Sequence, residues 1–146
     1  LYASHLAGKA INITKTTACH SIAYPITSYF GATHGQAVAF TLGSILEFNS
    51  EVNKKDINDE GGCEYFKKTI REISKFICLG SPIEAKEYLN KLMIQTGLKT
   101  KLSDIGIKSS PDFDIILKNG FNPKRVKNNP RKLTKEKLRE ILENIK

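Results

Sequence analysis

The fold of this chain is decided by residues 18–49, which read ACHSIAYPITSYFGATHGQAVAFTLGSILEFN. Glu47 is the only formally charged residue in this stretch, and the seventeen residues before it add only Lys9 and Lys15. A segment with so little charge is expected to be mostly buried. We therefore expect residues 1–49 to form the centre of the protein.

Two histidines, His20 and His34, stand fourteen residues apart in this apolar stretch. An unpaired polar group in a dry site costs roughly 1 to 3 kcal/mol, so each ring must be hydrogen-bonded, packed as a neutral amphipath or bound to a metal. Small neighbours such as Ala23 and Gly31 leave room for a ligand to approach. The spacing by itself leaves the structural and the metal-binding interpretation evenly balanced.

A metal shared by both rings requires the chain to bend between them. On one unbroken helix, fourteen residues at a rise of ~1.5 Å would separate the rings by roughly 21 Å, far more than bonds of ~2 Å allow. Pro25 removes a backbone donor, Gly31 has free dihedral angles, and Thr33 is a favourable N-cap. These residues favour a bend between the two histidines.

The bend predicts two helices. We predict that the first ends near Tyr24, that residues 25–33 form a connection, and that the second runs from about His34 to Asn49. His20 would then lie in the last turn of the first helix, close to the start of the next. Tyr24, one turn beyond His20, would share its face.

The chain as a whole has the composition of one folded domain. Its 146 residues are 40% hydrophobic and 26% charged, which is ordinary for a soluble globular protein with a real core. No stretch approaches eighteen consecutive apolar residues, so we expect no membrane span and no membrane partner. Because Leu1 lies inside an apolar helical pattern without a cap or an initiating methionine, we expect further sequence upstream.

The three cysteines, Cys19, Cys63 and Cys78, are odd in number and lack a C-x-x-C pairing. This favours a reducing compartment, and hence a cytoplasmic protein, over a disulfide framework. Cys19 is a candidate ligand or nucleophile because it adjoins His20, although a small buried hydrophobe is the favoured role. The third histidine, His5, is either structural or lines the same cavity.

The net charge of +8 comes mostly from the C-terminal end, since residues 122–146 hold nine Lys or Arg against three Glu. Clustered cations can bind the phosphates of nucleic acid. However, Leu138, Ile141 and Leu142 belong to a helical apolar stripe, which favours a terminal helix that docks by one side and exposes its charges. Nearly no aromatic residues interleave these cations, so we expect no nucleic-acid partner.

Apolar spacing is helical almost throughout the chain, and the alternation typical of strands is nearly absent. The candidate helices are 1–14, 18–24, 34–49, about 62–78, 82–96, 111–119 and 134–145, and Asn53 to Gly62 is an expected exposed loop. We therefore predict an all-α bundle of one domain, residues 1–146, with an apolar core over about 1–49 and peripheral helices over about 62–146.

Three motifs carry a resemblance to a known family. They are AGKAIN at residues 7–12, HSIAYP at 20–25 and HGQAVAF at 34–40. Together they resemble the C-terminal helical domain of the iron-containing (group III) alcohol dehydrogenases. The run KAINITKTTA at 9–18 is similar to the subgroup that includes phosphonoacetaldehyde reductases, and the segment NNPRKLT at 128–134 resembles the way these enzymes end.

The resemblance implies a metal site of which this chain holds half. In that family one aspartate and three histidines bind the metal, and His20 and His34 match the last two histidines. The aspartate and first histidine would lie before Leu1, as would the α/β nucleotide-binding domain. The implied metal is Fe2+, although nitrogen and oxygen ligands also suit Zn2+ and Mn2+. The resemblance thus implies an enzyme whose isolated C-terminal part is inactive.

The resemblance also implies roles for two more residues and the partners of the enzyme. Tyr24 and Gly35 would lie near the nicotinamide of NAD or NADP, Tyr24 also acting as a catalytic residue. The implied substrate is a small alcohol or aldehyde, phosphonoacetaldehyde being one candidate. Lys15 with Thr16 and Thr17 can offer a charge and hydroxyls to an anionic substrate such as a phosphonate, although a solvated or capping role is favoured for these three residues. The whole enzyme is expected to be a homodimer or a higher homo-oligomer.

This sequence departs from the family pattern at two positions. Many members have histidine in place of Tyr24, and a phenol donates a hydrogen bond but does not take up a proton near neutral pH as imidazole does. Its role as a proton relay is therefore open. Thr33 replaces a frequent proline, which is compatible with helix capping.

Two other functions stay open. One is a metal lyase similar to dehydroquinate synthase, against which Gln36 and the Thr14 to Thr17 run speak. The other is a non-enzymatic helical binding module that uses the basic C-terminal end.

Overall fold

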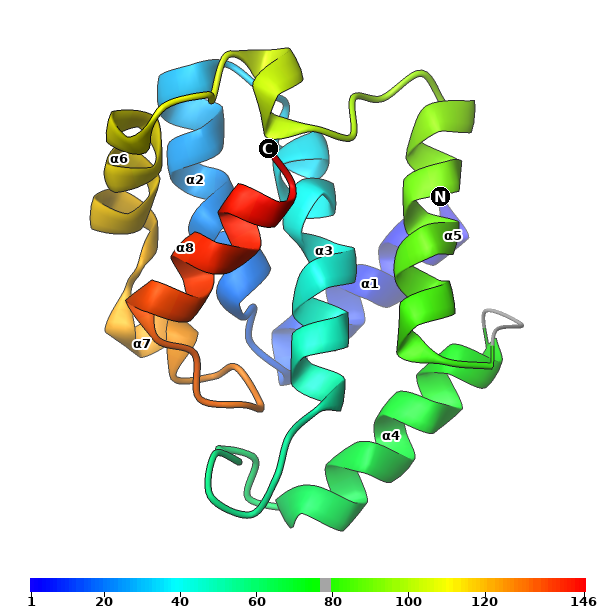
Figure 1. Ribbon diagram of the computed structural model, residues 1–146. Helices are drawn as coiled ribbons and strands as arrows, with labels where there is room; N and C mark the ends of the chain where they lie inside the picture. The colour runs from blue at the N-terminus through cyan, green and yellow to red at the C-terminus, as the bar shows by residue number, and fades with distance from the viewer. Residues whose placement is uncertain (77–79) are drawn as a thin grey trace.

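The computed structural model describes residues 1–76 and 80–146, which form helices joined by short connections (Figure 1). The helices are α1 (Tyr2–Ile13), α2 (Ala18–Phe30), α3 (His34–Ser50), α4 (Gly62–Phe76), α5 (Pro82–Gln95), the 3-10 turn η1 (Leu102–Ile105), α6 (Ser110–Gly120), α7 (Pro123–Val126) and α8 (Lys135–Asn144). Within these residues there is no strand, and an isolated antiparallel bridge joins Ile57 to Arg131. The predicted all-α class is confirmed.

Most predicted helices begin and end within two residues of the observed ones. The last two residues of the predicted helix 62–78, including Cys78, lie outside the described residues. The candidate helices do not include η1 and α7, each of which has four residues. A segment of that length is too short to show a period of 3.6 residues.

Helix α2 contradicts the predicted boundary near Tyr24, because it continues through Pro25 and ends at Phe30. The expected connection over residues 25–33 is therefore wrong, and only three residues, 31–33, join α2 to α3. Gly31 ends α2 in the left-handed conformation, with φ of 73°. That conformation costs a glycine nothing, so the reversal falls at Gly31 instead of at the proline.

A close contact with α6 explains how α2 accommodates Pro25. Proline lacks the N–H that would bond to the carbonyl of Ser21, so the helix loses one hydrogen bond there. Gly120 packs directly against this place: a Cβ at position 120 would lie 3.0 Å from Pro25 Cγ and 3.2 Å from Ile22 Cα. The buried Ser21 hydroxyl donates a hydrogen bond to the Gly120 carbonyl. Tertiary packing thus offsets the cost of the proline.

The main core lies between α2 and α3 and the later helices that cover them. Its fully buried large side chains come from across the chain: Ile22, Ile26, Leu102, Ile107, Ile116, Leu138 and Leu142. The core therefore begins at Ala18, and the expectation that residues 62–146 are peripheral is wrong for η1, α6 and α8. Because these helices fill the surface of α2 and α3, they complete the core that residues 1–17 were expected to supply.

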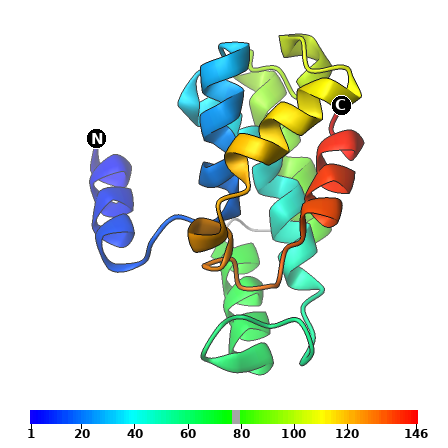
Figure 2. The same ribbon diagram turned by 90° about the vertical axis from the view of Figure 1, so that its left-hand side faces the viewer.

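Helix α1 stands apart from the bundle (Figure 2) and contains no buried residue. Leu6 is 46% exposed and Ile11 is 53% exposed, although both were expected in the core. Thr14 and Thr17 at the two ends of the following connection have extended backbones, which carry α1 away from α2. The expectation that the core includes residues 1–17 is therefore wrong.

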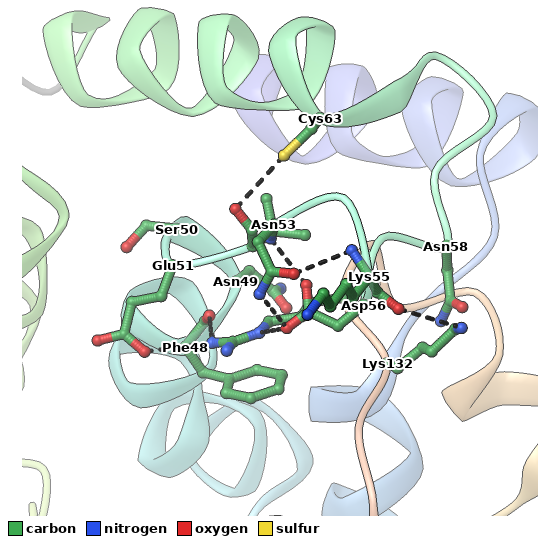
Figure 3. A network of polar contacts seen from close by, with 12 residues as sticks. Phe48, Asn49, Ser50, Glu51, Asn53, Lys55, Asp56, Asn58, Cys63 and Lys132 are labelled. Atoms are coloured by element: carbon green, nitrogen blue, oxygen red, sulfur yellow. Dashed lines mark hydrogen bonds and ion pairs between the residues drawn. The ribbon is translucent and has the colours of Figure 1, made fainter.

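Arg131 joins the end of α3 to the segment before α8, and its partners Phe48 and Asp56 belong to the polar network drawn in Figure 3. Its Nε donates to Asp56 at 2.8 Å, its Nη1 donates to the Phe48 carbonyl at 2.7 Å, and its guanidinium carbon lies 4.3 Å from the centroid of the Phe48 ring. Next to it, the buried amides of Asn49 and Asn129 donate to each other at 3.2 and 2.7 Å. This network fixes the C-terminal end of α3, which lies opposite the end that carries His34.

The C-terminal helix behaves as its apolar stripe predicts. In α8 the side chains of Leu138, Ile141 and Leu142 are buried, whereas Lys137 pairs with Glu140 at 2.8 Å on the solvent side. The docking of this helix by one face is confirmed. Among the described residues, no helix has the length and the hydropathy needed to cross a bilayer.

Candidate metal centre

The rings of His20, His34 and Tyr24 form one cluster on the surface formed by α2 and α3. The centroids of the two imidazole rings are 5.6 Å apart, and the planes are tilted by 59°. The Tyr24 ring also lies 5.6 Å from the His34 ring. The predicted meeting of the two histidines, with Tyr24 one turn from His20, is confirmed as geometry.

The route by which the chain brings them together differs from the prediction. His20 lies in the first turn of α2 and not in its last turn. After Gly31 the chain turns back, and Thr33 at the N-cap of α3 is extended, with ψ of 147°. His34, the first residue of α3, therefore lies beside the middle of α2, next to Tyr24. Thr33 occupies the predicted cap position, but its side chain makes no cap hydrogen bond.

The surroundings of His20 keep its imidazole neutral. Partial burial holds the pKa of His20 below its usual range, and the nearby His34 and Arg125 lower that pKa further. An imidazole with a lowered pKa carries no proton on one ring nitrogen at neutral pH. That nitrogen is free to bind a metal ion.

The donor set fits part of a metal site. Bonds of about 2.0 to 2.1 Å from one ion to two imidazole nitrogens place ring centroids about 5 to 6 Å apart, as they are between His20 and His34. Protein sites for such ions have four or more ligands including water, whereas nowhere in the described residues do three His, Cys, Asp or Glu side chains come together. Residues 1–46 contain no Asp or Glu. The pair therefore needs ligands from elsewhere.

Cys19 does not belong to this cluster, despite being next to His20 in sequence. Its side chain is 5% exposed, and burial raises the pKa of the thiol to about 11. A thiol with such a pKa is neither a thiolate ligand nor a nucleophile at neutral pH. The favoured interpretation of Cys19 as a small buried hydrophobe agrees with this environment.

The other candidate residues lie around the cluster at different distances. Gly35 follows His34 on the exposed start of α3, and no atom lies within 4 Å of the place of an added Cβ. Lys15 lies between α1 and α2 and lines a separate cavity. His5 is exposed on α1 and does not line that cavity, so its expected place in a shared cavity is not supported by the described residues.

The sequence analysis missed Arg125, which lies on α7. Its guanidinium carbon lies 4.5 Å from the centroid of the Tyr24 ring, in a cation–π contact. The available signal was Asn122-Pro123, a cap followed by proline at the first helical position; the Asn122 side chain accepts a hydrogen bond from the amide of Lys124. That signal predicts a helix start but not what its arginine contacts.

The two close imidazoles of His20 and His34 have no third His, Cys, Asp or Glu beside them among the described residues. The family to which this chain belongs follows from sequence comparison. The chain belongs to the Fe-containing alcohol dehydrogenase family, whose C-terminal domain matches residues 1–146.

Two curated relatives have similar sequences. A phosphonoacetaldehyde reductase of Streptomyces viridochromogenes is 29% identical over 140 residues, which cover 96% of this chain and 34% of that protein. The NADP-dependent alcohol dehydrogenase 3 of Entamoeba histolytica is 29% identical over 104 residues, or 71% of this chain and 24% of that protein. The chain spans at most about a third of the length of these relatives.

Solved structures have the same fold. A sulfoacetaldehyde reductase of Bifidobacterium kashiwanohense superposes with a TM-score of 0.68 at 21% identity, covering 90% of this chain and 31% of that one. An alcohol dehydrogenase of Oenococcus oeni gives a TM-score of 0.68 at 21% identity, covering 97% and 35%. The helical bundle is thus one part of a larger enzyme fold in these proteins.

Proposed function

We propose that this chain is the metal-binding helical part of an NAD(P)-dependent, iron-containing alcohol dehydrogenase that reduces a small aldehyde. The observation that carries the proposal is the 5.6 Å separation of the His20 and His34 rings in a chain of this family. Because the chain spans about a third of its relatives, we assign the nucleotide-binding domain and the remaining metal ligands to residues outside it. On that assignment, residues 1–146 alone are inactive.

His20 and His34 would hold the metal through unprotonated imidazole nitrogens. The lowered pKa of His20 supports this role, since the neutral ring is the form that binds. We propose Fe2+, and the same donors also suit Zn2+ and Mn2+. When bound, such a metal polarises the aldehyde carbonyl as a Lewis acid and so favours hydride transfer from the nicotinamide.

Tyr24 would orient the substrate. The Tyr24 ring contacts the His34 ring and also makes a cation–π contact with Arg125, yet the residue is 47% exposed. A fixed ring with an accessible hydroxyl can donate a hydrogen bond to the substrate oxygen or pass a proton through water. We therefore assign Tyr24 a catalytic role as a hydrogen-bond donor.

Gly35 would allow the nicotinamide cofactor to approach the metal ligands. The place of an added Cβ is open, so packing within this chain does not require glycine there. A larger side chain next to His34 would occupy the surface that a cofactor from the missing domain must reach. The Entamoeba relative is named as NADP-dependent, which supports NADP, and NAD is the alternative.

The substrate is proposed to be a small aldehyde, with phosphonoacetaldehyde as the first candidate because of the relative from Streptomyces viridochromogenes. Lys15, near the start of α2, would help to bind it.

We also propose a cytoplasmic enzyme, which the free thiols of Cys19 and Cys63 support, and a homodimer or higher homo-oligomer. We propose no nucleic-acid or membrane partner.

Oxidation of NADPH or NADH by small aldehydes tests this function in the full-length protein loaded with Fe2+. We expect turnover that is lost in His34→Ala and kept in His5→Ala, a matched change on exposed α1. The proposal is wrong if the wild type reduces no aldehyde with either nucleotide, or if His34→Ala retains full activity.

A further inference from the structure

A cavity of about 400 Å³ lies beside the histidine cluster and is lined mostly by cationic and polar residues. These residues come from two segments that are far apart in sequence: Ile11, Lys15, Thr16, Lys124, Arg125 and Asn128. The Asn128 side chain approaches the Thr16 carbonyl at 3.5 Å, which brings the residues after α7 against the connection between α1 and α2. Three cations thus surround one cavity.

The cavity adjoins the candidate metal centre through a single aromatic ring. Arg125 lines the cavity and also lies 4.5 Å from the Tyr24 ring, which in turn lies 5.6 Å from the His34 ring. The distance from the Arg125 guanidinium carbon to the centroid of the His34 ring is therefore at most the sum of these two distances.

Among the residues that the structure describes, Lys15, Lys124 and Arg125 form no ion pair with an acidic side chain. No Asp or Glu occurs in residues 1–46 or 115–135, which together supply the whole lining. By contrast, Arg131 pairs with Asp56 and Arg139 pairs with Asp114. Within the described ranges 1–76 and 80–146, Arg125 forms no such pair. Like charges gathered without a counterion repel one another, and an anion in the cavity would relieve this repulsion.

We propose that Arg125, together with Lys15 and Lys124, binds the phosphonate end of an anionic aldehyde substrate and so determines substrate specificity. This inference rests on the proposed function. A guanidinium presents paired N–H groups that match the oxygens of a tetrahedral oxyanion, whereas the two lysines add positive charge.

The position of Arg125 favours the substrate over the 2′-phosphate of NADP as the source of the anion. A two-carbon aldehyde joins its carbonyl to its phosphonate within one small molecule, so both ends can lie on the two sides of Tyr24. In NADP the 2′-phosphate is on the adenosine ribose, at the opposite end of the dinucleotide from the nicotinamide. One NADP molecule cannot place its reacting ring and its 2′-phosphate one aromatic ring apart.

The test compares a charged with a neutral aldehyde in the full-length, metal-loaded enzyme. For phosphonoacetaldehyde and for propionaldehyde, kcat/KM is measured in the wild type, in Arg125→Gln and in Arg125→Lys. Loss of a charge-assisted contact should lower the ratio of the two kcat/KM values roughly 10- to 100-fold in Arg125→Gln, mainly through KM. Arg125→Lys should recover part of the loss, because it keeps the charge but not the planar group.

Lys127→Gln is the matched control, since Lys127 is an exposed cation in the same segment that does not line the cavity. It should leave the ratio within about twofold, as surface charges away from a ligand contribute little. Thermal unfolding and metal content verify that each variant is folded and loaded. Calorimetric titration with phosphonoacetate gives a second readout, in which binding is weakened most in Arg125→Gln, less in Arg125→Lys and not in Lys127→Gln.

Two results would overturn the inference: an equal loss for both aldehydes in Arg125→Gln, or a rise in KM for NADPH without a change in the aldehyde ratio. The second result would assign the anion to the cofactor. A wild type that reduces no aldehyde contradicts the proposed function itself and is distinct from both.

Discussion

The buried hydroxyl of Ser21 donates a hydrogen bond to the carbonyl of Gly120, ninety-nine residues later in the chain. Ser21 follows His20 directly, so this contact fixes the start of α2 against the end of α6. The same place accommodates Pro25, whose ring would lie 3.0 Å from a Cβ at position 120. The helix that carries His20 is thus held in place by a contact with α6 that requires glycine at position 120.

Gly120→Ala should destabilise the fold. The new methyl group would meet Pro25 Cγ and the backbone of Ile22, which cannot move as a flexible side chain does, so the free energy of unfolding should fall by about 1 to 3 kcal/mol. Urea unfolding followed by circular dichroism measures the change. Gly35→Ala is the control, because its Cβ would meet nothing within 4 Å, and it should not destabilise. Equal stabilities of Gly120→Ala and the wild type would contradict this packing.

Acid should weaken the network around Arg131. Although desolvation raises the pKa of Asp56, hydrogen bonds from Asn53 and from the Arg131 guanidinium outweigh it and hold that pKa below its usual value of 3.8. The unfolded state therefore takes up this proton at a higher pH than the folded state. The stability from Asp56 is present above pH about 4 to 5 and is lost as the pH falls through the lowered pKa.

Asp56→Asn should accordingly lower the free energy of unfolding at pH 7 by about 1 to 3 kcal/mol and flatten its dependence on pH below 5. The measurement is urea unfolding at pH 7, 5 and 3. Glu60→Gln, an exposed change in the same loop, should leave both values close to those of the wild type. An unchanged acid slope in Asp56→Asn would show that other carboxylates dominate.

Tyr24→Phe should separate the role of the hydroxyl from the role of the aromatic ring. Phenylalanine keeps the aromatic surface against His34 and Arg125, so metal content and folding should not change. If the hydroxyl donates to the substrate oxygen, kcat of the full-length enzyme should fall at least tenfold. Steady-state kinetics measure this, and a kcat within twofold of the wild type would exclude a catalytic role for the hydroxyl.

Residues 1–146 in isolation should not oxidise NADPH with any aldehyde. The candidate site holds the two imidazoles of His20 and His34, and no group of three potential metal ligands gathers among the residues described. An absorbance assay at saturating Fe2+ and NADPH checks this, with the full-length protein as the positive control. Turnover by the isolated chain would show that the proposed division of the site between two parts is wrong.

Local signals predicted much of the fold. Ser81-Pro82 predicts the start of α5, where the Ser81 hydroxyl accepts a hydrogen bond from the amide of Glu84. Ser110-Pro111-Asp112 predicts the start of α6, although the observed cap is Ser109. Such caps depend on neighbours within a few residues, which is why sequence alone reveals them. Pro25 was misjudged because its cost is offset by Gly120, a contact that no local pattern shows.

In the candidate site, too, local patterns revealed some residues, whereas contacts between distant segments determined others. His20 and His34 could be paired because their spacing and small neighbours are local, and a resemblance to a known family pointed to the same residues. Arg125 was missed because its contact with Tyr24 depends on the path of the chain after α6. The exposure of α1 was also missed. A low charge predicts that a segment is buried, but it does not tell which other helices already cover the core.

Metal analysis of the full-length protein tests the central claim most directly. The account predicts about one metal ion per chain by elemental analysis, loss of that metal in His20→Ala and in His34→Ala, and full retention in His5→Ala. All three variants should unfold at temperatures close to that of the metal-free wild type, because neither His20 nor His34 is fully buried. Unchanged metal content in both His20→Ala and His34→Ala would contradict the account.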